Sequence, residues 1–328
     1  MLNTKDINQA VSKKVSIKSR LSFLNNHITY LILVIIVVGI VTTILNPNFL
    51  TLRNFFNVMQ QFSILGILTM CMSLLMISGG LDISIGNMAG LGAMIFARML
   101  LAGISIWISV IVVLIVGTVL GFINGLIVAK SKVTPLIITM GMNYVFLGVA
   151  FILAGGRPQT ISDQFEFLGG AKIANIPISM LILLAVLLFA YFLRKYTKYG
   201  RRLNAIGGNV QAAYFSGINV DLHIISIYAL SGLIVGLAAL VLVSRFGMVR
   251  ADTGSDYALQ ALAAAIIGGI PLQGGKGSVV GAFFGVLLIG ILYNAMNIIG
   301  VSSYEQTVIL GAIIVFATVI GNIGKMKR

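Results

Sequence analysis

The chain has 328 residues, of which 59% are apolar and only 9% are charged, and its mean hydropathy is +1.06. Water-soluble domains carry roughly 45–50% apolar and about 25% charged residues, so this composition excludes a soluble globular protein. The net charge of +14 does not indicate nucleic-acid binding, because the basic residues lie in short stretches beside apolar segments instead of on one folded face.

Apolar segments recur along the whole chain and predict an all-α, polytopic membrane protein with about ten transmembrane helices. The first segment follows basic residues but is long and lacks a small-residue cleavage site, so we expect an uncleaved span. The predicted spans are 28–45, 55–78, 85–103, 105–128, 133–154, 177–193, 222–243, 257–271, 278–299 and 306–323. Residues 1–27 and 324–328 are then cytoplasmic tails on either side of a transmembrane domain at 28–323.

Basic residues divide unevenly between the two sets of loops. Positively charged loops resist translocation, so this bias predicts that both termini are cytoplasmic. With that orientation sixteen Lys and Arg residues lie inside, Arg98 lies within a span, and five lie outside. The outside set is Arg53, Arg157, Lys172, Arg245 and Arg250.

The stretch from Ser78 to Gly86 interrupts the apolar pattern and places a carboxylate, Asp82, at a helix junction. A carboxylate at the bilayer centre costs about 2.5–3.5 kcal/mol, so Asp82 is expected at a helix end or facing protein. We favour the end, where Asp82 or Ser84 caps the next helix, and a proton or ion site is the alternative. Cys71, the single cysteine, lies in an apolar run and is expected to be buried.

The Gly-rich stretch 267–278 has the composition of a phosphate-binding loop but not its pattern. That pattern needs a Gly separated by four residues from the Gly-Lys pair, and Ser or Thr after the Lys; here Ile270 and Gly277 occupy those positions. We therefore expect a tight cytoplasmic turn, no ATP hydrolysis by this chain and no cofactor. Its Gly-Gly pairs echo Gly79-Gly80, which hints at an internal repeat.

The segment 200–219 is basic and longer than a connector between two spans requires. Asn209 is expected to cap a short helix that runs to Tyr214, with Gly217 ending it and Ala212 and Ala213 forming a small-residue face. A helix this short is poorly stable alone in water, so it should dock on its own bundle or on a cytoplasmic partner.

Several long motifs, in this order, resemble the ribose and simple-sugar type permease subunits of bacterial ATP-binding cassette importers. The resemblance lies in Gly79 to Gly86, Pro135 to Gly141, Gly200 to Ile218, Ala261 to Gly277, Asn294 and Val301 to Tyr304. It implies a permease domain at 28–323 in the bacterial cytoplasmic membrane and import of a monosaccharide by alternating access. It also implies three partners: a cytoplasmic cassette ATPase, an extracytoplasmic solute-binding protein and a second permease subunit, as a homodimer. Leu147 and Ile270-Pro271 depart from the pattern and leave the sugar open.

By the same resemblance, segment 200–219 is similar to the coupling helix that rests in a groove of the ATPase. The residues assigned to ATPase coupling are Gly200, Arg201, Ala205, Gly207, Gly208, Asn209, Ala212, Ala213, Ser216 and Gly217.

Hydroxyl-rich solutes need hydrogen-bonding side chains along their path, and each such side chain could instead bridge helices. The path candidates are Gln60, Gln61, Asn124, Asn143, Gln260, Asn294 and Asn297. Two outer loops carry charges of both signs, which suits electrostatic docking of a soluble binding protein, although a merely solvated loop is the alternative. The docking candidates are Arg157, Arg245, Arg250, Asp252 and Asp256.

Two other functions fit the residues less well. An ion-coupled secondary carrier for a small polar solute commonly needs carboxylates or His deep in its spans, and here Asp82, His27 and His223 all lie near span ends. It remains the alternative. A membrane enzyme would need paired carboxylates, a metal set or an activated nucleophile, and the sequence offers no such constellation, so we expect no catalytic or metal site.

Overall fold

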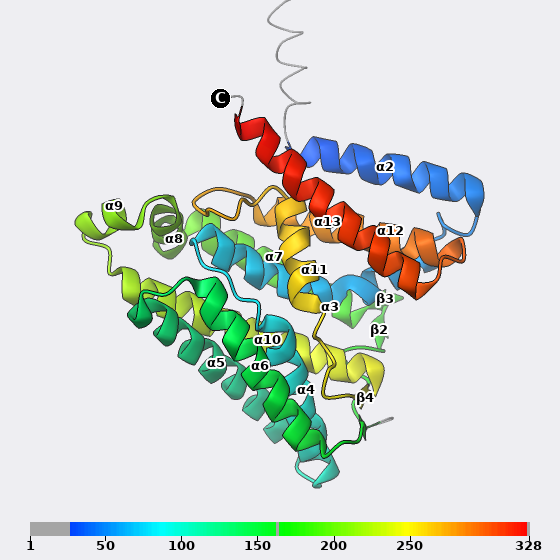
Figure 1. Cartoon of the computed structure of the whole chain (residues 1–328). Coiled ribbons are helices and arrows are strands. Elements are labelled where there is room, and N and C mark those ends of the chain that lie inside the picture. The colour runs from blue at the N-terminus through cyan, green and yellow to red at the C-terminus, as the bar shows by residue number, and fades with distance from the viewer. Residues whose placement is uncertain (1–26, 162–163, 327–328) are drawn as a thin grey trace, which may run out of the picture.

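The computed structural model describes residues 27–161 and 164–326, so nearly all of the predicted N-terminal tail and the last two residues of the C-terminal tail lie outside the described residues. Within these ranges the chain is a helical bundle with four two-residue strands, β1 paired with β4 and β2 with β3, both antiparallel (Figure 1). The helices are α2 (His27–Leu45), α3 (Leu52–Ile77), α4 (Ile85–Leu101), α5 (Ile106–Ser131), α6 (Pro135–Ala154), α7 (Ile178–Tyr196), α8 (Lys198–Gly208), α9 (Val210–Phe215), α10 (Val220–Phe246), α11 (Tyr257–Ile267), α12 (Val279–Ile298) and α13 (Ser303–Met326). The strands are β1 (Gln159–Thr160), β2 (Lys172–Ile173), β3 (Ile176–Pro177) and β4 (Met248–Val249).

Each predicted span coincides with a helix, namely α2 to α7 and α10 to α13. Among the described residues, seven helices are long and apolar enough to cross a membrane: α2, α3, α5, α6, α7, α10 and α12. The apolar helices α4 and α11 are shorter, with 17 and 11 residues. An all-helical, multi-pass membrane protein is therefore confirmed, and the count of ten spans stays a prediction.

Helix α3 forms the centre of the bundle. Thr51 caps its first turn by accepting a hydrogen bond from the Asn54 amide, and the helix is buried almost continuously from Val58 to Ile77. Helices α7, α10, α11 and α12 pack around it, whereas α4 packs against α5, α6 and α10. The outer faces of α2, α5 and α6 expose Leu, Ile, Val and Phe side chains, as lipid-facing helices do.

Glycines at four-residue spacing, Gly117 and Gly121 on α5 and Gly232 and Gly236 on α10, allow these two helices to approach closely. A Cβ added at Gly121 would lie 2.3 Å from the Tyr228 carbonyl oxygen, and one at Gly232 would lie 2.1 Å from that of Gly117. Lipid offers no hydrophobic drive between helices, so such close backbone packing is a main source of their association.

Two short helices follow non-helical backbone, of which the stretch before α4 has no exposed residue and the loop before α11 has four. The stretch 80–84 precedes α4, and the loop 250–256 precedes α11. This loop rests on a groove of α4, because a Cβ at Gly90 would lie 2.0 Å from the Thr253 oxygen and one at Gly86 would lie 2.3 Å from the Gly254 oxygen. Irregular backbone at membrane depth is tolerated where it is buried in protein or lines a cavity.

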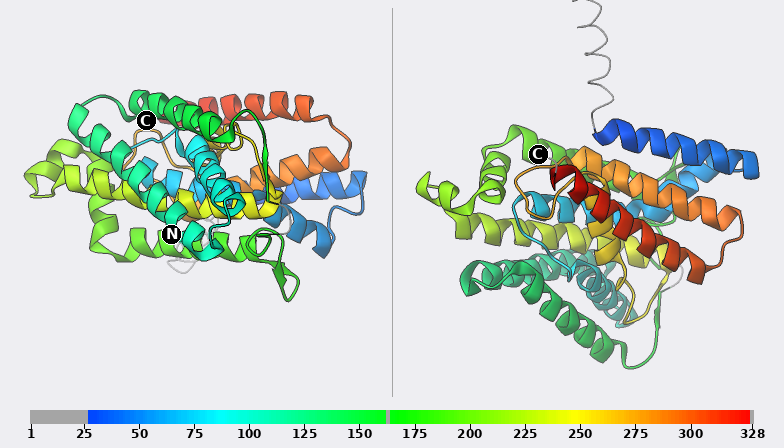
Figure 2. Two further views of the ribbon diagram at one scale, coloured as in Figure 1. Left: turned by 90° about the horizontal axis from the view of Figure 1, so that it is seen from below. Right: turned by 45° about the horizontal axis from the view of Figure 1, so that its top comes forward.

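Loops predicted to share a side of the membrane gather at the same end of the bundle. Strand pairing of β1 with β4 joins the connection after α6 to the connection after α10. At the other end, Lys130 forms a salt bridge of 2.6 Å with Asp221. Helices α8 and α9 project from that end in all views, and the strands lie toward the opposite end (Figures 1 and 2). The structure groups the loops as the charge bias predicted, and which end faces the cytoplasm stays a prediction.

Candidate functional site

A cavity of about 370 Å³ lies between α3, the end of α10, the loop 250–256, α11 and α12. Its lining residues are Gln61, Phe62, Arg245, Phe246, Asp252, Thr253, Gly254, Ser255, Asp256, Tyr257, Gln260 and Tyr293. Small-molecule sites commonly have volumes of about 300–1,000 Å³ and combine apolar or aromatic walls with a few polar groups. The cavity therefore has the size and the chemistry of a site for one small polar solute.

Aromatic side chains form one wall of this cavity. The ring centroids of Phe62 and Tyr293 lie 5.6 Å apart, with the planes tilted by 33°. The Gln260 amide nitrogen lies 3.4 Å from the Tyr293 hydroxyl, a long and therefore weak hydrogen bond. The amide and the hydroxyl consequently keep most of their hydrogen-bonding capacity for another partner.

Arg245 is held against the wall of the cavity by α3. Its Nη1 atom donates hydrogen bonds to the carbonyl oxygens of Gln60 at 3.0 Å and of Gln61 at 2.7 Å. Gly169 packs on the Arg245 backbone and donates its amide to the Ser244 hydroxyl at 2.8 Å. The Arg245 side chain is therefore turned toward α3, and its predicted role in docking stays a prediction.

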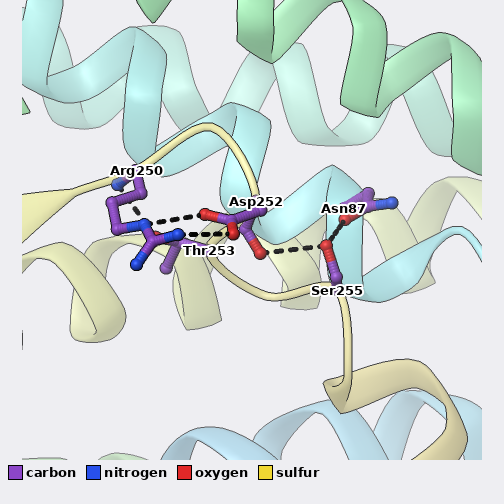
Figure 3. Close-up of polar contacts among 5 residues, drawn as sticks. All are labelled: Asn87, Arg250, Asp252, Thr253 and Ser255. Atoms are coloured by element: carbon purple, nitrogen blue, oxygen red, sulfur yellow. Dashed lines mark hydrogen bonds and ion pairs between the residues drawn. The ribbon is translucent and has the colours of Figure 1, made fainter. Parts of the chain in front are cut away.

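The loop 250–256 carries an exposed ion pair and is anchored below it (Figure 3). Arg250 donates from Nε and Nη2 to the two carboxylate oxygens of Asp252, at 3.1 and 2.9 Å. Below them, Ser255 Oγ lies 2.9 Å from both the Asn87 side-chain oxygen and the Asp252 carbonyl oxygen. Because Arg250 and Asp252 are 63% and 49% exposed, their pairing stabilises the fold by only about 0–1 kcal/mol, and both charges face outward.

The structure brings the remaining docking candidates near this loop. Arg157 is exposed two residues before β1, and β1 pairs with β4, which leads into the loop. Asp256 is exposed, precedes α11 and lines the cavity. The five candidates thus lie at one end of the bundle, three of them, Arg245, Asp252 and Asp256, line the cavity, and their role in docking stays a prediction.

Two of the seven amide candidates, Gln61 and Gln260, line the cavity. The other five hold parts of the described bundle together. Gln60 donates to the Gly169 carbonyl at 2.6 Å, Asn143 accepts from Asn87 at 2.9 Å, and Asn124 donates to Ser84 at 2.9 Å. Asn294 exchanges two hydrogen bonds with Asn54, of 2.8 and 3.0 Å, and Asn297 accepts from Gln306 at 2.8 Å. These contacts favour the helix-bridging alternative for the five, whose place on the path stays a prediction.

Asp82 is buried within the bundle, with 1% of its surface exposed. One carboxylate oxygen accepts from the Ser84 amide at 2.8 Å and from the Ser84 hydroxyl at 2.5 Å, and the other accepts from Asn124 at 3.2 Å. Ser84 occupies the N-cap position of α4 but makes no side-chain cap bond. The capping prediction is therefore wrong in detail, because Asp82 binds the turn before α4. Among the described residues, no group of three or more His, Cys, Asp or Glu could hold a metal ion.

Two helices form the projecting segment that the sequence singled out. The Asn209 side chain accepts from the Ala212 amide at 2.9 Å and caps α9, and Gly217 follows with φ of +78°, which confirms the predicted cap and stop. Ala213 packs in a small cluster with Ile206 and Val220. Ala212 is exposed, as are Val210, Tyr214 and Phe215, the last at 84%. Exposed apolar side chains gathered at one place mark a surface for a partner.

Three Gly-Gly pairs meet where α8 ends, which we call the glycine junction: Gly79-Gly80, Gly207-Gly208 and Gly274-Gly275. The Gly275 amide donates to the Ile77 carbonyl at 2.9 Å. A Cβ at Gly207 would lie 2.0 Å from the same oxygen, and one at Gly274 would lie 2.8 Å from the Gly79 Cα. Backbone contact thus joins the projecting helices to the end of α3 and to the α11–α12 loop. Close packing explains why these positions are glycine, and the internal repeat stays a prediction.

Three aromatic residues of the cavity, Phe62, Tyr257 and Tyr293, did not emerge from the sequence. Each lies in an apolar segment, where an aromatic side chain can equally face lipid. Neighbouring amide side chains could have pointed to two of these aromatic residues. Gln61 precedes Phe62, and Gln260 lies three residues after Tyr257 on the same helix face.

The structure combines a helical membrane bundle, a cavity large enough for one small solute, and exposed apolar side chains on the projecting helix α9. This is the architecture of a membrane transport subunit. The family described as "Branched-chain amino acid transport system / permease component" matches residues 54–318. The chain belongs to this family of transport permease components.

Curated relatives extend over most of the chain. The chain is 34% identical over 297 residues to the ribose import permease protein of Escherichia coli (strain K12), covering 89% of this chain and 92% of the relative. It is 36% identical over 315 residues to that of Bacillus subtilis (strain 168), covering 95% and 96%. It is 32% identical over 334 residues to the galactose/methyl galactoside import permease protein of E. coli (strain K12), covering 95% and 98%. No solved structure matches the chain.

Proposed function

We propose that this chain is the permease subunit of a bacterial ATP-binding cassette importer and translocates a monosaccharide, ribose or a similar sugar, across the cytoplasmic membrane by alternating access. The observation that carries the proposal is the similarity to ribose import permeases over 89–95% of the chain. The cavity supports it, because its volume and its mixed aromatic and polar lining suit one small hydroxylated solute.

The proposal assigns the energy of transport to a partner. Residues 270 and 277 do not fit a phosphate-binding loop, and the exposed apolar side chains of α9 offer a surface on which a cytoplasmic ATPase can dock. The ten coupling residues, from Gly200 to Gly217, then transmit the motion of that ATPase. The orientation follows, with ten spans in a permease domain at 28–323, both termini and α9 in the cytoplasm, and the loop 250–256 outside.

Two further partners complete the proposed importer. An extracytoplasmic solute-binding protein delivers the sugar to the end that carries Arg157, Arg250, Asp252 and Asp256, whose mixed charges suit electrostatic docking. A second copy of the permease pairs with the first across lipid-exposed helices. The chain itself carries out no chemistry, so no cofactor is assigned to it.

Reconstitution into proteoliposomes with the cognate ATPase and binding protein tests the proposal. We expect uptake of labelled ribose, galactose or allose that requires ATP and the binding protein and that survives an uncoupler. Uptake that persists without the ATPase and collapses with the uncoupler would instead support the ion-coupled carrier, for which the buried Asp82 is the available carboxylate. ATP-driven uptake of leucine with no uptake of any sugar would overturn the monosaccharide assignment.

A further inference from the structure

We propose that the 370 Å³ cavity is a binding site on the permease itself, in which one neutral monosaccharide pauses between release from the binding protein and passage through the bundle. This inference rests on the proposed function. It adds a location, a set of contacts and a reason for selectivity within the membrane subunit.

The walls of the cavity match the two kinds of surface on a sugar ring. The C–H face of a pyranose or furanose is apolar and can pack against the rings of Phe62 and Tyr293, which lie side by side. The hydroxyl groups need donors and acceptors in the plane of the sugar ring, and the amides of Gln61 and Gln260 provide both. The weak contact between Gln260 and Tyr293 leaves these groups free to turn toward a ligand.

The charges around the cavity favour a neutral ligand over an anion. The carboxylates of Asp252 and Asp256 line it and can accept hydrogen bonds from sugar hydroxyl groups, and the charge of Asp252 is already balanced by Arg250. The cation in the lining, Arg245, already uses Nη1 for two carbonyl oxygens of α3. Arg245, Arg250, Asp252 and Asp256 together carry no net charge, so a sugar phosphate or an amino acid carboxylate loses hydration here without an excess of positive charge to replace it.

The backbone around the cavity is interrupted, as it is in many transporter sites. Loop 250–256 packs against α4 through Gly254, whose φ of +103° disfavours other residues, and α11 begins only at Tyr257. Substrate sites of membrane transporters commonly form where helices are discontinuous, because the unwound backbone exposes polar groups at membrane depth. The geometry here places such a segment directly against the aromatic wall.

The first test measures binding to the permease–ATPase complex in lipid nanodiscs without the binding protein. Saturation-transfer NMR should detect binding of D-ribose, D-galactose or D-allose to the wild-type complex. The signal of the bound sugar should be mostly lost in Tyr293→Leu and in Gln260→Leu. Tyr30→Leu and Gln164→Leu are matched controls, because both side chains are exposed and lie outside the cavity lining. Absence of signal at the wild type, or equal signal in all four variants, would overturn the site.

The second test separates the site from the proposed function. With saturating binding protein and ATP, we expect Gln260→Leu to import at least about five-fold less sugar than the wild type, as loss of one hydrogen bond to the passing solute implies. In the control Gln164→Leu, whose side chain is exposed and lies outside the cavity lining, uptake and ATP hydrolysis stimulated by the loaded binding protein should both stay within about two-fold of the wild type. Wild-type uptake by the cavity variants would overturn this inference alone, whereas failure of the wild type to import any sugar would overturn the proposed function.

Discussion

The glycine junction makes a sharp prediction at two adjacent residues. In Gly207→Ala the new Cβ would lie 2.0 Å from the Ile77 carbonyl oxygen and 2.6 Å from the Gly275 amide nitrogen, both backbone atoms. Ordinary contact begins at about 3.4 Å, so α8 must move by about 1.4 Å relative to α3. Overpacking of this kind typically costs about 1–3 kcal/mol. We expect ATPase stimulation by the loaded binding protein and sugar uptake to fall at least about ten-fold.

The neighbouring glycine supplies the control for this prediction. A Cβ at Gly208 meets nothing within 4 Å, so Gly208→Ala adds the same methyl group to the same helix without a clash. Ala is also the better helix former, by roughly 0.5–1 kcal/mol. Both variants should be assayed for thermal stability, uptake and ATP hydrolysis in proteoliposomes. Equal uptake and stability of the two would refute the claim that close backbone contact at Gly207 joins α8 to the end of α3.

Three further predictions concern the charged loop, the buried carboxylate and the projecting helix. Reversing Arg250 or Asp252 should slow uptake by weakening delivery from the binding protein while the ATPase still assembles; unchanged uptake in R250E and D252R would contradict the docking role. Asp82→Ala leaves two Ser84 donors and one Asn124 donor unpaired, at about 1–3 kcal/mol each, so a solubilised variant should melt well below Asp82→Asn; equal melting would argue against these bonds. Phe215→Ser should reduce co-purification of the ATPase without reducing membrane insertion, and undiminished co-purification would exclude α9 from the contact.

Features that depend on nearby residues were predictable from the sequence. The long helices follow from apolar runs, and the start of α9 follows from Asn209, whose side chain caps an amide three residues away. The fate of Asp82 was not predictable, because the decision between a helix cap and a buried turn depends on Asn124, which lies 42 residues away. The sequence was enough to estimate the free-energy cost of placing the Asp82 carboxylate in the membrane, but it could not identify Asn124 as its hydrogen-bond partner.

The cavity could not be predicted for the same reason. Phe62, Tyr257 and Tyr293 lie on α3, α11 and α12, and they share a wall only because these three helices pack together. The glycine junction could not be predicted either, because each Gly-Gly pair, taken alone, indicates only a turn or an ordinary helix position. Gly207 acquires its importance from the Ile77 carbonyl, a contact that no local pattern encodes.

Helix α3 carries both the cavity and the glycine junction on a single piece of buried backbone. Phe62 and Ile77 are fifteen residues apart, so at 1.5 Å per residue the two sites are separated by about 22 Å along the helix axis. A continuous, tightly packed helix transmits a push along its length with little compression, because protein interiors resist deformation. A substitution that shifts one end of α3 should therefore be correctable by a second substitution at the other end. Second-site suppressors of Gly207→Ala are expected to cluster around Gln61 and Phe62, at the solute end of the same helix.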